Sequence, residues 1–192
     1  MRRRRLSINQ SDAIAGYVFI LPYLFFLVTV ILYPLIQGLY MSFHEWGIFG
    51  APKYVGIANY NQLITDSNFW SSLWHTLYFV LLTTPALVVI GLLLATGLNT
   101  SFKGRSLARG RIFFPYLLTV SIVSAIWRWM LQRNYGLVNY YLGKIGVKPV
   151  GWLTEARTAM PAVAVATIWW TVGFNVIVFL AALQDIPQQL YD

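Results

Sequence analysis

Four long apolar stretches constrain the fold of this chain more than any other feature. They cover residues 13–41, 73–98, 112–131 and 159–183. The hydrocarbon core of a bilayer is about 30 Å thick, and an α-helix needs about 20 apolar residues to cross it. Each stretch is long enough to do so. The sequence therefore predicts an all-α fold, a polytopic bundle of transmembrane helices with four spans.

The composition agrees with a membrane protein. Hydrophobic residues make up 58% of the 192 residues and charged residues 10%, whereas charged residues form about a quarter of a soluble domain. Four spans and their short loops leave no room for a separate soluble domain. We expect a basic N-terminal segment at 1–12 and a transmembrane domain at 13–183. Because the sequence contains no cysteine, disulfides and thiolate metal sites are excluded.

The distribution of positive charge predicts the orientation of the chain in the membrane. Eight Lys and Arg residues lie on one side of the predicted spans, namely Arg2–Arg5, Lys103, Arg105, Arg109 and Arg111. Five lie on the other side, namely Lys53, Arg133, Lys144, Lys148 and Arg157. Cytoplasmic loops of membrane proteins carry an excess of positive charge. The bias predicts a cytoplasmic N-terminus and, after four spans, a return of the chain to the cytoplasmic side.

Sequence motifs for enzyme chemistry do not occur. His44 and Glu45 begin an HExxH pattern, but Ile48 stands where the second histidine of a zinc site would fall. Neither a GxSxG nucleophile elbow nor a Walker-type phosphate loop is present. We therefore predict no catalytic residues, no metal site and no cofactor bound by this chain. The net charge of +8 lies mostly beside apolar stretches, which favours a role in topology over binding of nucleic acid.

The last predicted span carries one polar and aromatic face. Its members recur at i, i+3, i+4 and i+7, the repeat of a single helix face. They are Thr167, Trp170, Thr171 and Phe174, with Asn175 beside them. Such a face offers hydrogen bonds and a stacking surface to a polyol or sugar. A second interpretation stays open on this pattern, in which the threonines bond their own helix backbone and the rings pack against a neighbouring helix.

The third predicted span carries a second polar face, formed by Ser121, Ser124 and Arg128. We include the two serines among the candidate residues of a substrate path. We expect Arg128 to extend its charge to the membrane interface, because long cationic side chains near the end of a span commonly do so.

Five segments in chain order carry a resemblance to a known family. They read FILPYLFFLVTVILYPLIQGLYMSF, GIANYNQLITDSNFWSSLWHTLYFV, FKGRSLARGRIFFPYLL, IWRWMLQRNYGLVNYYL and IWWTVGFNVIVFLAALQDIPQQLYD. With these segments the chain resembles the carbohydrate-type permease subunits of bacterial binding-protein-dependent ABC importers, the family of the maltose and glycerol-phosphate systems. The resemblance implies the type I importer permease fold, which has about six spans in a complete subunit.

The resemblance also implies roles at the end of the chain. The family's IPxxLY pattern opens a cytoplasmic segment that couples the permease to its ATPase, and it is present here as Ile186, Pro187, Leu190 and Tyr191. Asp192 stands where the family usually has the Glu that begins the EAA motif. We therefore expect 184–192 to be the incomplete start of the coupling segment and the chain to be a fragment of a permease. Counted back from Ile186, the family's sugar-contacting positions fall on the polar face of the last span.

By this resemblance we expect a permease subunit of an ATP-driven carbohydrate importer that forms half of the translocation path. Its expected location is the bacterial plasma (inner) membrane, crossed several times, and its expected mechanism is alternating access. The implied partners are a second permease subunit, ATP-binding cassette subunits that bind the ATP, an extracytoplasmic solute-binding protein, the lipid bilayer and a carbohydrate. Two other classes stay open: a membrane-embedded enzyme acting on glycosyl or lipid-linked substrates, and a non-transporting membrane scaffold. An enzyme would need paired acids, but Glu45, Asp66 and Glu155 are scattered single carboxylates.

Overall fold

The computed structural model describes residues 8–47 and 50–187. The chain divides into two compact units, 1–71 and 72–192, and each is described here by itself. The described residues are helical apart from loops and one short hairpin. The predicted all-α class is therefore confirmed.

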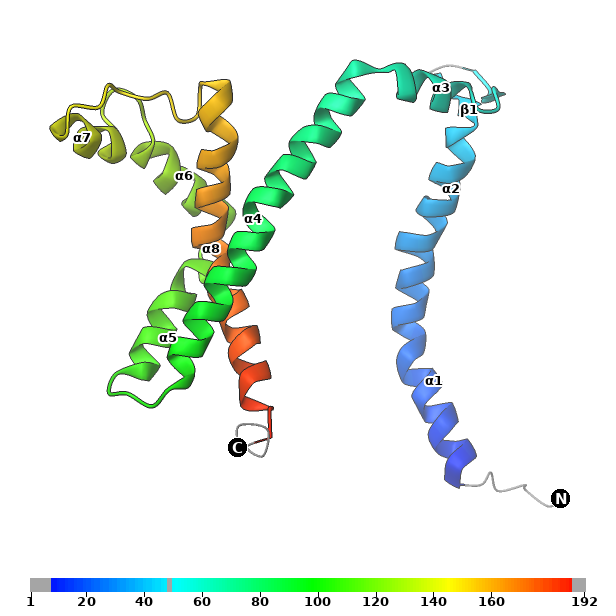
Figure 1. Ribbon diagram of the computed structural model, residues 1–192. Coiled ribbons are helices and arrows are strands. Elements are labelled where there is room, and N and C mark those ends of the chain that lie inside the picture. Colours follow the sequence, from blue (N-terminus) through cyan, green and yellow to red (C-terminus); the bar gives the residue numbers. More distant parts are fainter. Residues whose placement is uncertain (1–7, 48–49, 188–192) are drawn as a thin grey trace. The chain divides into compact units, whose positions relative to one another are not determined.

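The first unit begins with one long apolar helix (Figure 1). It consists of α1 (Ile8–Phe26), the π-helical segment η1 (Leu27–Leu32) and α2 (Tyr33–Ser42). The π segment ends at Leu32, two residues before Pro34, which has no N–H to donate to the carbonyl four residues earlier. Tyr33 donates its N–H to the carbonyl of Val28, five residues back. The wider turn thus absorbs the proline without ending the helix.

A hairpin and a short helix follow the C-terminal end of this long helix. Strands β1 (His44–Glu45) and β2 (Lys53–Tyr54) pair antiparallel, with His44 opposite Tyr54. Helix α3 (Ala58–Thr65) follows. Its Asn59 donates from Nδ2 to the carbonyl oxygens of Ser42 at 2.9 Å and His44 at 3.1 Å. These bonds satisfy backbone carbonyls that the end of α2 leaves open.

The second unit is built around two long helices that pack together, α4 (Ser67–Asn99) and α8 (Ala156–Gln184) (Figure 1). Their contact is close because α4 has a glycine there: a Cβ at Gly91 would lie 3.1 Å from the Cβ of Asn175. Further along, apolar side chains from both helices form the core, namely Ala95, Leu98, Val176 and Leu180. The third helix of this packing is α5 (Arg105–Phe113), whose Ala108 and Ile112 cover the same core.

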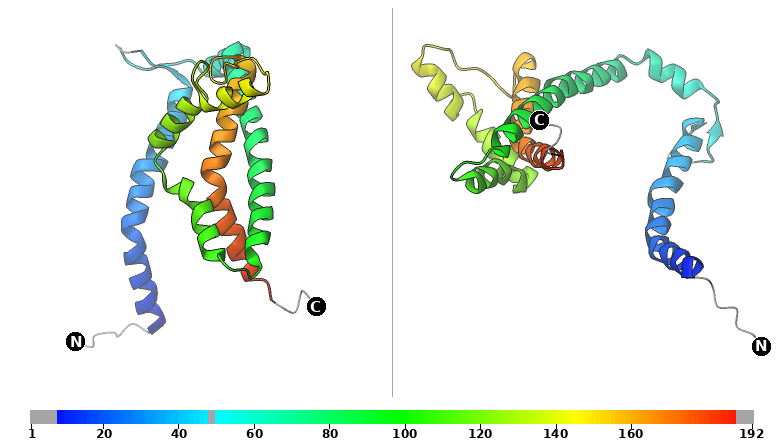
Figure 2. Two further views of the ribbon diagram at one scale, coloured as in Figure 1. Left: turned by 90° about the vertical axis from the view of Figure 1, so that its left-hand side faces the viewer. Right: turned by 60° about the horizontal axis from the view of Figure 1, so that its bottom comes forward.

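The third predicted span is the stretch where the structure differs from the sequence expectation. Residues 112–131 do not form one straight helix. Helix α5 continues into the 3₁₀ segment η2 (Phe114–Leu117), and α6 (Val120–Met130) then leaves at an angle of 95° (Figure 2). Leu118 and Thr119 between them have extended backbone angles. The break therefore lies directly after a 3₁₀ turn that contains Pro115, which cannot donate a helical hydrogen bond.

The segment between α6 and α8 is pinned by one buried amide. It contains α7 (Leu137–Lys144), and Asn139 of this helix is only 6% exposed. The Asn139 Nδ2 donates to the carbonyls of Arg133 at 3.0 Å and Val150 at 2.9 Å. Its Oδ1 accepts from the Val150 N–H at 3.2 Å and from Trp152 Nε1 at 2.9 Å. One side chain thus ties both ends of the segment together.

Within the described part of the chain, three helical stretches are long and apolar enough to cross a membrane: Asp12–Ser42, Ser67–Asn99 and Ala156–Gln184. The bent pair Arg105–Leu117 and Val120–Met130 makes a fourth if it counts as one span. The first, second and last predicted spans each fall inside one of the three long helices. Because these helices extend beyond the apolar runs, the second begins at Ser67 where the hydropathy pattern placed the start near residue 73.

Candidate functional site

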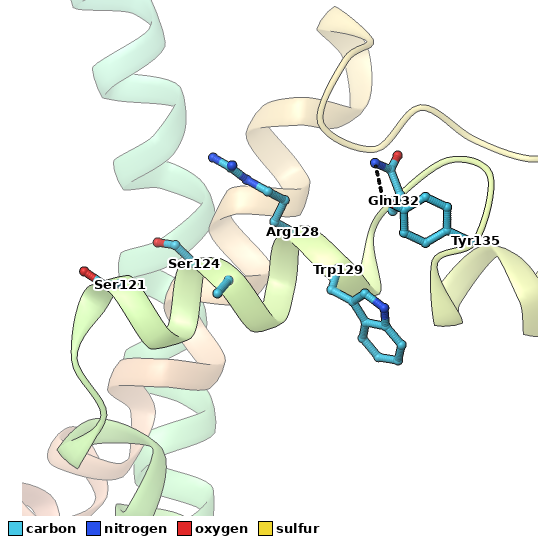
Figure 3. A pocket seen from close by; sticks show the side chains of 7 residues that line it. Ser121, Ser124, Arg128, Trp129, Gln132 and Tyr135 are labelled. Atoms are coloured by element: carbon cyan, nitrogen blue, oxygen red, sulfur yellow. Dashed lines mark hydrogen bonds between the residues drawn. The ribbon is translucent and has the colours of Figure 1, made fainter.

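The polar face predicted on the third span lines a pocket in the structure, here called the α6 pocket. It is a hollow of about 390 Å³ along α6 and the turn that follows it. Its lining residues are Ser121, Ser124, Ala125, Arg128, Trp129, Gln132 and Tyr135. The side chains of Ser121, Ser124 and Arg128 extend from the same side of the helix (Figure 3). Gln132 Nε2 donates to the Tyr135 hydroxyl at 3.3 Å at the far end of the pocket.

A second hollow of about 310 Å³, here called the α6–α8 groove, lies between α6 and α8. It brings together residues from both predicted faces, with Ser124 and Arg128 on α6 and Thr167 and Trp170 on α8. The rest of its lining is mainly apolar, contributed by Val120, Val123, Trp127, Leu131, Leu153, Ala162, Val163 and Ala166. Since Ser124 and Arg128 line both hollows, the pocket and the groove meet along one edge of α6.

The two helices are joined beside the groove by aromatic side chains. Trp127 of α6 and Trp169 of α8 meet edge to face, with ring centroids 5.8 Å apart. Trp170 Nε1 donates to the carbonyl of Leu118 at 3.1 Å, in the extended stretch where the helix breaks. The tryptophan predicted to line a path therefore also holds the break in place.

The threonines of the α8 face bond their own helix backbone, as the second interpretation of their pattern predicts. Thr167 Oγ1 donates to the carbonyl of Val163 at 2.9 Å, and Thr171 Oγ1 donates to that of Thr167 at 2.7 Å. Each hydroxyl oxygen can still accept a hydrogen bond, since donation uses only its proton. The face thus keeps acceptors available, while its donors are occupied by the helix backbone.

The remaining candidates on α8 lie beyond both hollows. Phe174 stacks on Tyr116 of η2 with ring centroids 5.1 Å apart. Asn175 donates from Nδ2 to the Thr171 carbonyl at 3.2 Å, and its Cβ faces Gly91 of α4. These two residues, like Thr171, are not among the lining of the α6 pocket or the groove. Their role in a path stays a prediction, and their observed contacts are those of helix packing.

The predicted coupling residues fall at the end of the described chain. Ile186 is exposed and follows the last turn of α8, and Pro187 comes directly after it. Leu190, Tyr191 and Asp192 lie outside the described residues, as do Arg2–Arg5 of the basic N-terminal segment. Their predicted roles in coupling and in orientation stay predictions.

Four pocket residues were not among those that the sequence singled out, namely Ala125, Trp129, Gln132 and Tyr135. Trp129 and Tyr135 have the interfacial character of many aromatics in this chain, and Gln132 follows the end of α6. A signal for Gln132 does exist, because it continues the spacing of Ser121, Ser124 and Arg128 by four residues. Pro115 in η2 is a signal for a bend, but it does not encode the 95° angle or the direction in which α6 leaves, so the position of the pocket could not be predicted.

Two of the three carboxylates considered for an enzyme, Asp66 and Glu155, have structural partners. Asp66 Oδ1 accepts the Asn68 N–H at 2.8 Å, at the start of α4. Glu155 Oε1 accepts the Gly151 N–H at 3.0 Å and lies 3.5 Å from Arg133 Nη1. Neither residue lines the α6 pocket or the groove.

Comparison with known proteins identifies the class. No family model matches the chain. Over 187 residues it is 34% identical to the trehalose/maltose transport system permease protein MalF of Thermococcus litoralis. This match covers 97% of this chain and 63% of that protein. Over 184 residues it is 32% identical to the arabinooligosaccharides transport system permease protein AraP of Bacillus subtilis, covering 95% of this chain and 58% of that protein.

Solved structures share the fold. A crystal structure of a bacterial ABC transporter involved in the import of the acidic polysaccharide alginate matches with a TM-score of 0.75 at 26% identity, covering 95% of this chain and 62% of the matched chain. A bacterial alginate ABC transporter in complex with alginate pentasaccharide-bound periplasmic protein matches with a TM-score of 0.78 at 24% identity, covering 98% and 63%. This second likeness is one of fold.

The chain therefore has the sequence and the fold of permease subunits of ABC transporters. More narrowly, it is related to the permeases of carbohydrate ABC importers, which confirms the resemblance found in the sequence. It is a multi-pass membrane chain, as those relatives are. It spans 63% and 58% of the length of the two relatives named above.

Proposed function

We propose that this chain forms part of the membrane permease of an ATP-driven carbohydrate importer. In this proposal the α6 pocket and the α6–α8 groove are a section of the path that the carbohydrate follows. The observation that carries the proposal is the meeting of Ser124, Arg128, Thr167 and Trp170 along one hollow, in a chain related to sugar permeases.

The chemistry of this hollow suits a carbohydrate. Serine and threonine oxygens accept hydrogen bonds from sugar hydroxyls, and the guanidinium of Arg128 donates to sugar oxygens. Aromatic rings such as that of Trp170 give an apolar face against which the C–H side of a sugar ring packs. Because each group is mounted on α6 or α8, a change in the angle between these helices alters the binding surface.

The proposal also includes the other subunits of the importer. ATP hydrolysis takes place in separate cassette subunits, which contact the cytoplasmic segment that begins near Ile186. A second permease subunit completes the path, and a solute-binding protein delivers the carbohydrate from outside. Support comes from the relatives' names and from the alginate transporter that was crystallised with a periplasmic protein. The orientation with a cytoplasmic N-terminus is supported by the charge bias.

A membrane enzyme is less well supported by the structure. The carboxylates Asp66 and Glu155 hold backbone groups, and Glu155 is also ion-paired. We therefore place no reaction in this chain and propose that it hydrolyses nothing itself.

Transport by the complete importer tests this function. The full-length permease is co-expressed with its partner permease, its cassette subunits and its solute-binding protein, and all are reconstituted in proteoliposomes. Uptake of labelled maltose, trehalose, lactose, arabinose oligosaccharides and a uronate disaccharide is then measured with and without ATP. We expect ATP-dependent uptake of at least one carbohydrate. Uptake must disappear when the catalytic glutamate of the cassette subunit is replaced.

The same transport measurement can contradict the proposal. If the assembled complex hydrolyses ATP but accumulates no carbohydrate, or accumulates only a non-carbohydrate solute, the chain serves another transported class. A complex that assembles around this chain but neither hydrolyses ATP nor accumulates any solute supports the scaffold alternative.

A further inference from the structure

We propose that Arg128 makes the α6 pocket selective for carbohydrates that carry an anionic group, of which a ring carboxylate is the simplest. This inference rests on the proposed function and narrows its substrate class. It begins from the charge of the site: among the described residues, Arg128 is the one charged side chain that lines either the α6 pocket or the α6–α8 groove.

Within the described residues of the second unit, no carboxylate forms an ion pair with Arg128. Glu155 is engaged by Arg133 at 3.5 Å and by the Gly151 N–H at 3.0 Å. Asp185 follows the opposite end of α8, about 45 Å along the helix from Glu155 at 1.5 Å per residue. The guanidinium therefore brings a positive charge to the pocket that this unit does not neutralise.

The geometry of the neighbouring groups favours a small bound molecule as the partner. Ser121, Ser124 and Arg128 extend from one side of α6 (Figure 3), so an anion held by Arg128 would lie next to two hydroxyls. A guanidinium presents a planar set of N–H donors that matches the two oxygens of a carboxylate. The hydroxyls and the Gln132 amide would then bond the remaining oxygens of the sugar ring.

A neutral carbohydrate would use this site incompletely. The serines and Gln132 can bind its hydroxyl groups, but exposed Arg128 would then have only water as the partner of its charge. A lipid phosphate is the competing anion, and it would occupy Arg128 without any role for Ser121 and Ser124.

Binding to two matched probes separates these possibilities. The complete importer, in nanodiscs of zwitterionic lipid, is titrated by calorimetry with cellobiouronic acid and with cellobiose, which differ by one carboxylate. The variants are Arg128→Gln, which removes the charge, and Arg128→Lys, which keeps the charge but loses the planar donor set. The matched control is Arg157→Gln, because Arg157 is exposed in the first turn of α8 and lines neither hollow.

We expect the wild-type complex to bind the uronate at least tenfold more tightly than the neutral disaccharide. Arg128→Gln should weaken uronate binding by about tenfold to a hundredfold, the usual range for losing a charged hydrogen-bond partner, and change cellobiose binding by less than about threefold. Arg128→Lys should lie between the two, and Arg157→Gln should match the wild type. The preference should persist in nanodiscs that contain anionic lipid.

Four results would overturn the inference. Uronate affinity that is unchanged in Arg128→Gln means that the arginine serves lipid phosphates or solvent. Equal weakening of both probes means that it binds sugar hydroxyls without selecting charge. Binding of cellobiose with no preference for the uronate leaves the proposed function intact and rejects only the selectivity, whereas binding of neither probe together with absent carbohydrate uptake rejects both.

Discussion

At the scale of single residues, two side chains complete backbone hydrogen bonding that the helices leave open. Trp170 donates to the Leu118 carbonyl at the break before α6, and buried Asn139 joins the two ends of the segment from α6 to α8. An unpaired polar group is costly where water is excluded. Each of these residues therefore has a structural role that can be measured separately from transport.

Replacing Trp170 by Phe should lower stability and loosen the break. The ring is largely kept, but the Leu118 carbonyl loses its donor, and hydrogen bonds within membranes contribute about 0.5–1.5 kcal/mol. Trp169→Phe is the control, since Trp169 is 39% exposed and meets Trp127 only by its ring. The free energy of unfolding in detergent is compared for the two variants. Equal losses would show that ring volume, and not the hydrogen bond, is what matters.

Replacing Asn139 by Ala should release the segment between α6 and α8. The Val150 N–H and the Trp152 indole would lose their acceptor, and two unsatisfied buried groups cost about 2–4 kcal/mol together. Hydrogen–deuterium exchange across residues 131–155 should rise, with little change in α4. Asn134→Ala provides the control, because Asn134 is exposed. Unchanged exchange in Asn139→Ala would mean that the segment is held by other contacts.

At the scale of elements, α8 is the helix on which the second unit depends. It contacts α4 at Gly91, carries the core residues Val176 and Leu180, and approaches α5 so closely that only glycine fits at Gly173. A Cβ at that position would lie 2.9 Å from the Phe113 Cα. Small residues permit such close helix contacts in membrane proteins, where apolar side chains gain little by leaving lipid.

Gly173→Ala should therefore destabilise the packing of α8 on α5. The obstructing atoms belong to backbone and cannot rotate away, so we expect a loss of about 1–3 kcal/mol, typical of overpacking. Gly97→Ala should behave oppositely, because a Cβ there meets nothing within 4 Å and alanine favours a helix by up to about 1 kcal/mol. The measurement is the thermal unfolding of both variants and of the wild type. A neutral Gly173→Ala would mean that the helices can separate at no cost.

The helices show which parts of the fold could be predicted. The long apolar runs located three of the four predicted spans because length and hydropathy are local properties of the sequence. Pro115 favours a bend in the third span, but no local pattern encodes its location at Leu118 and Thr119 or its angle of 95°. The face of Ser121, Ser124 and Arg128 followed from helical spacing alone. Its meeting with Thr167 and Trp170 depends on how α6 crosses α8, which no local pattern encodes.

At the scale of the whole molecule, the relation to carbohydrate permeases and the chemistry of α6 both support the proposed path for a carbohydrate. The chain covers about three fifths of a relative such as MalF of Thermococcus litoralis, and the α6 pocket and α6–α8 groove both lie within that part. A path for a carbohydrate at this place requires that Ser124, which lines both hollows, is reached by water and covered by the transported molecule.

Cysteine labelling in the assembled importer tests that requirement most directly, because this chain has no cysteine of its own. Ser124→Cys is labelled with a membrane-impermeant maleimide, with and without the transported carbohydrate. Ile126→Cys is the control, since a residue two positions along lies on the opposite side of the helix. The account predicts that the carbohydrate slows labelling at position 124 severalfold and leaves position 126 unchanged. Labelling at 124 that the carbohydrate does not affect, or equal protection at both positions, would contradict a path along α6.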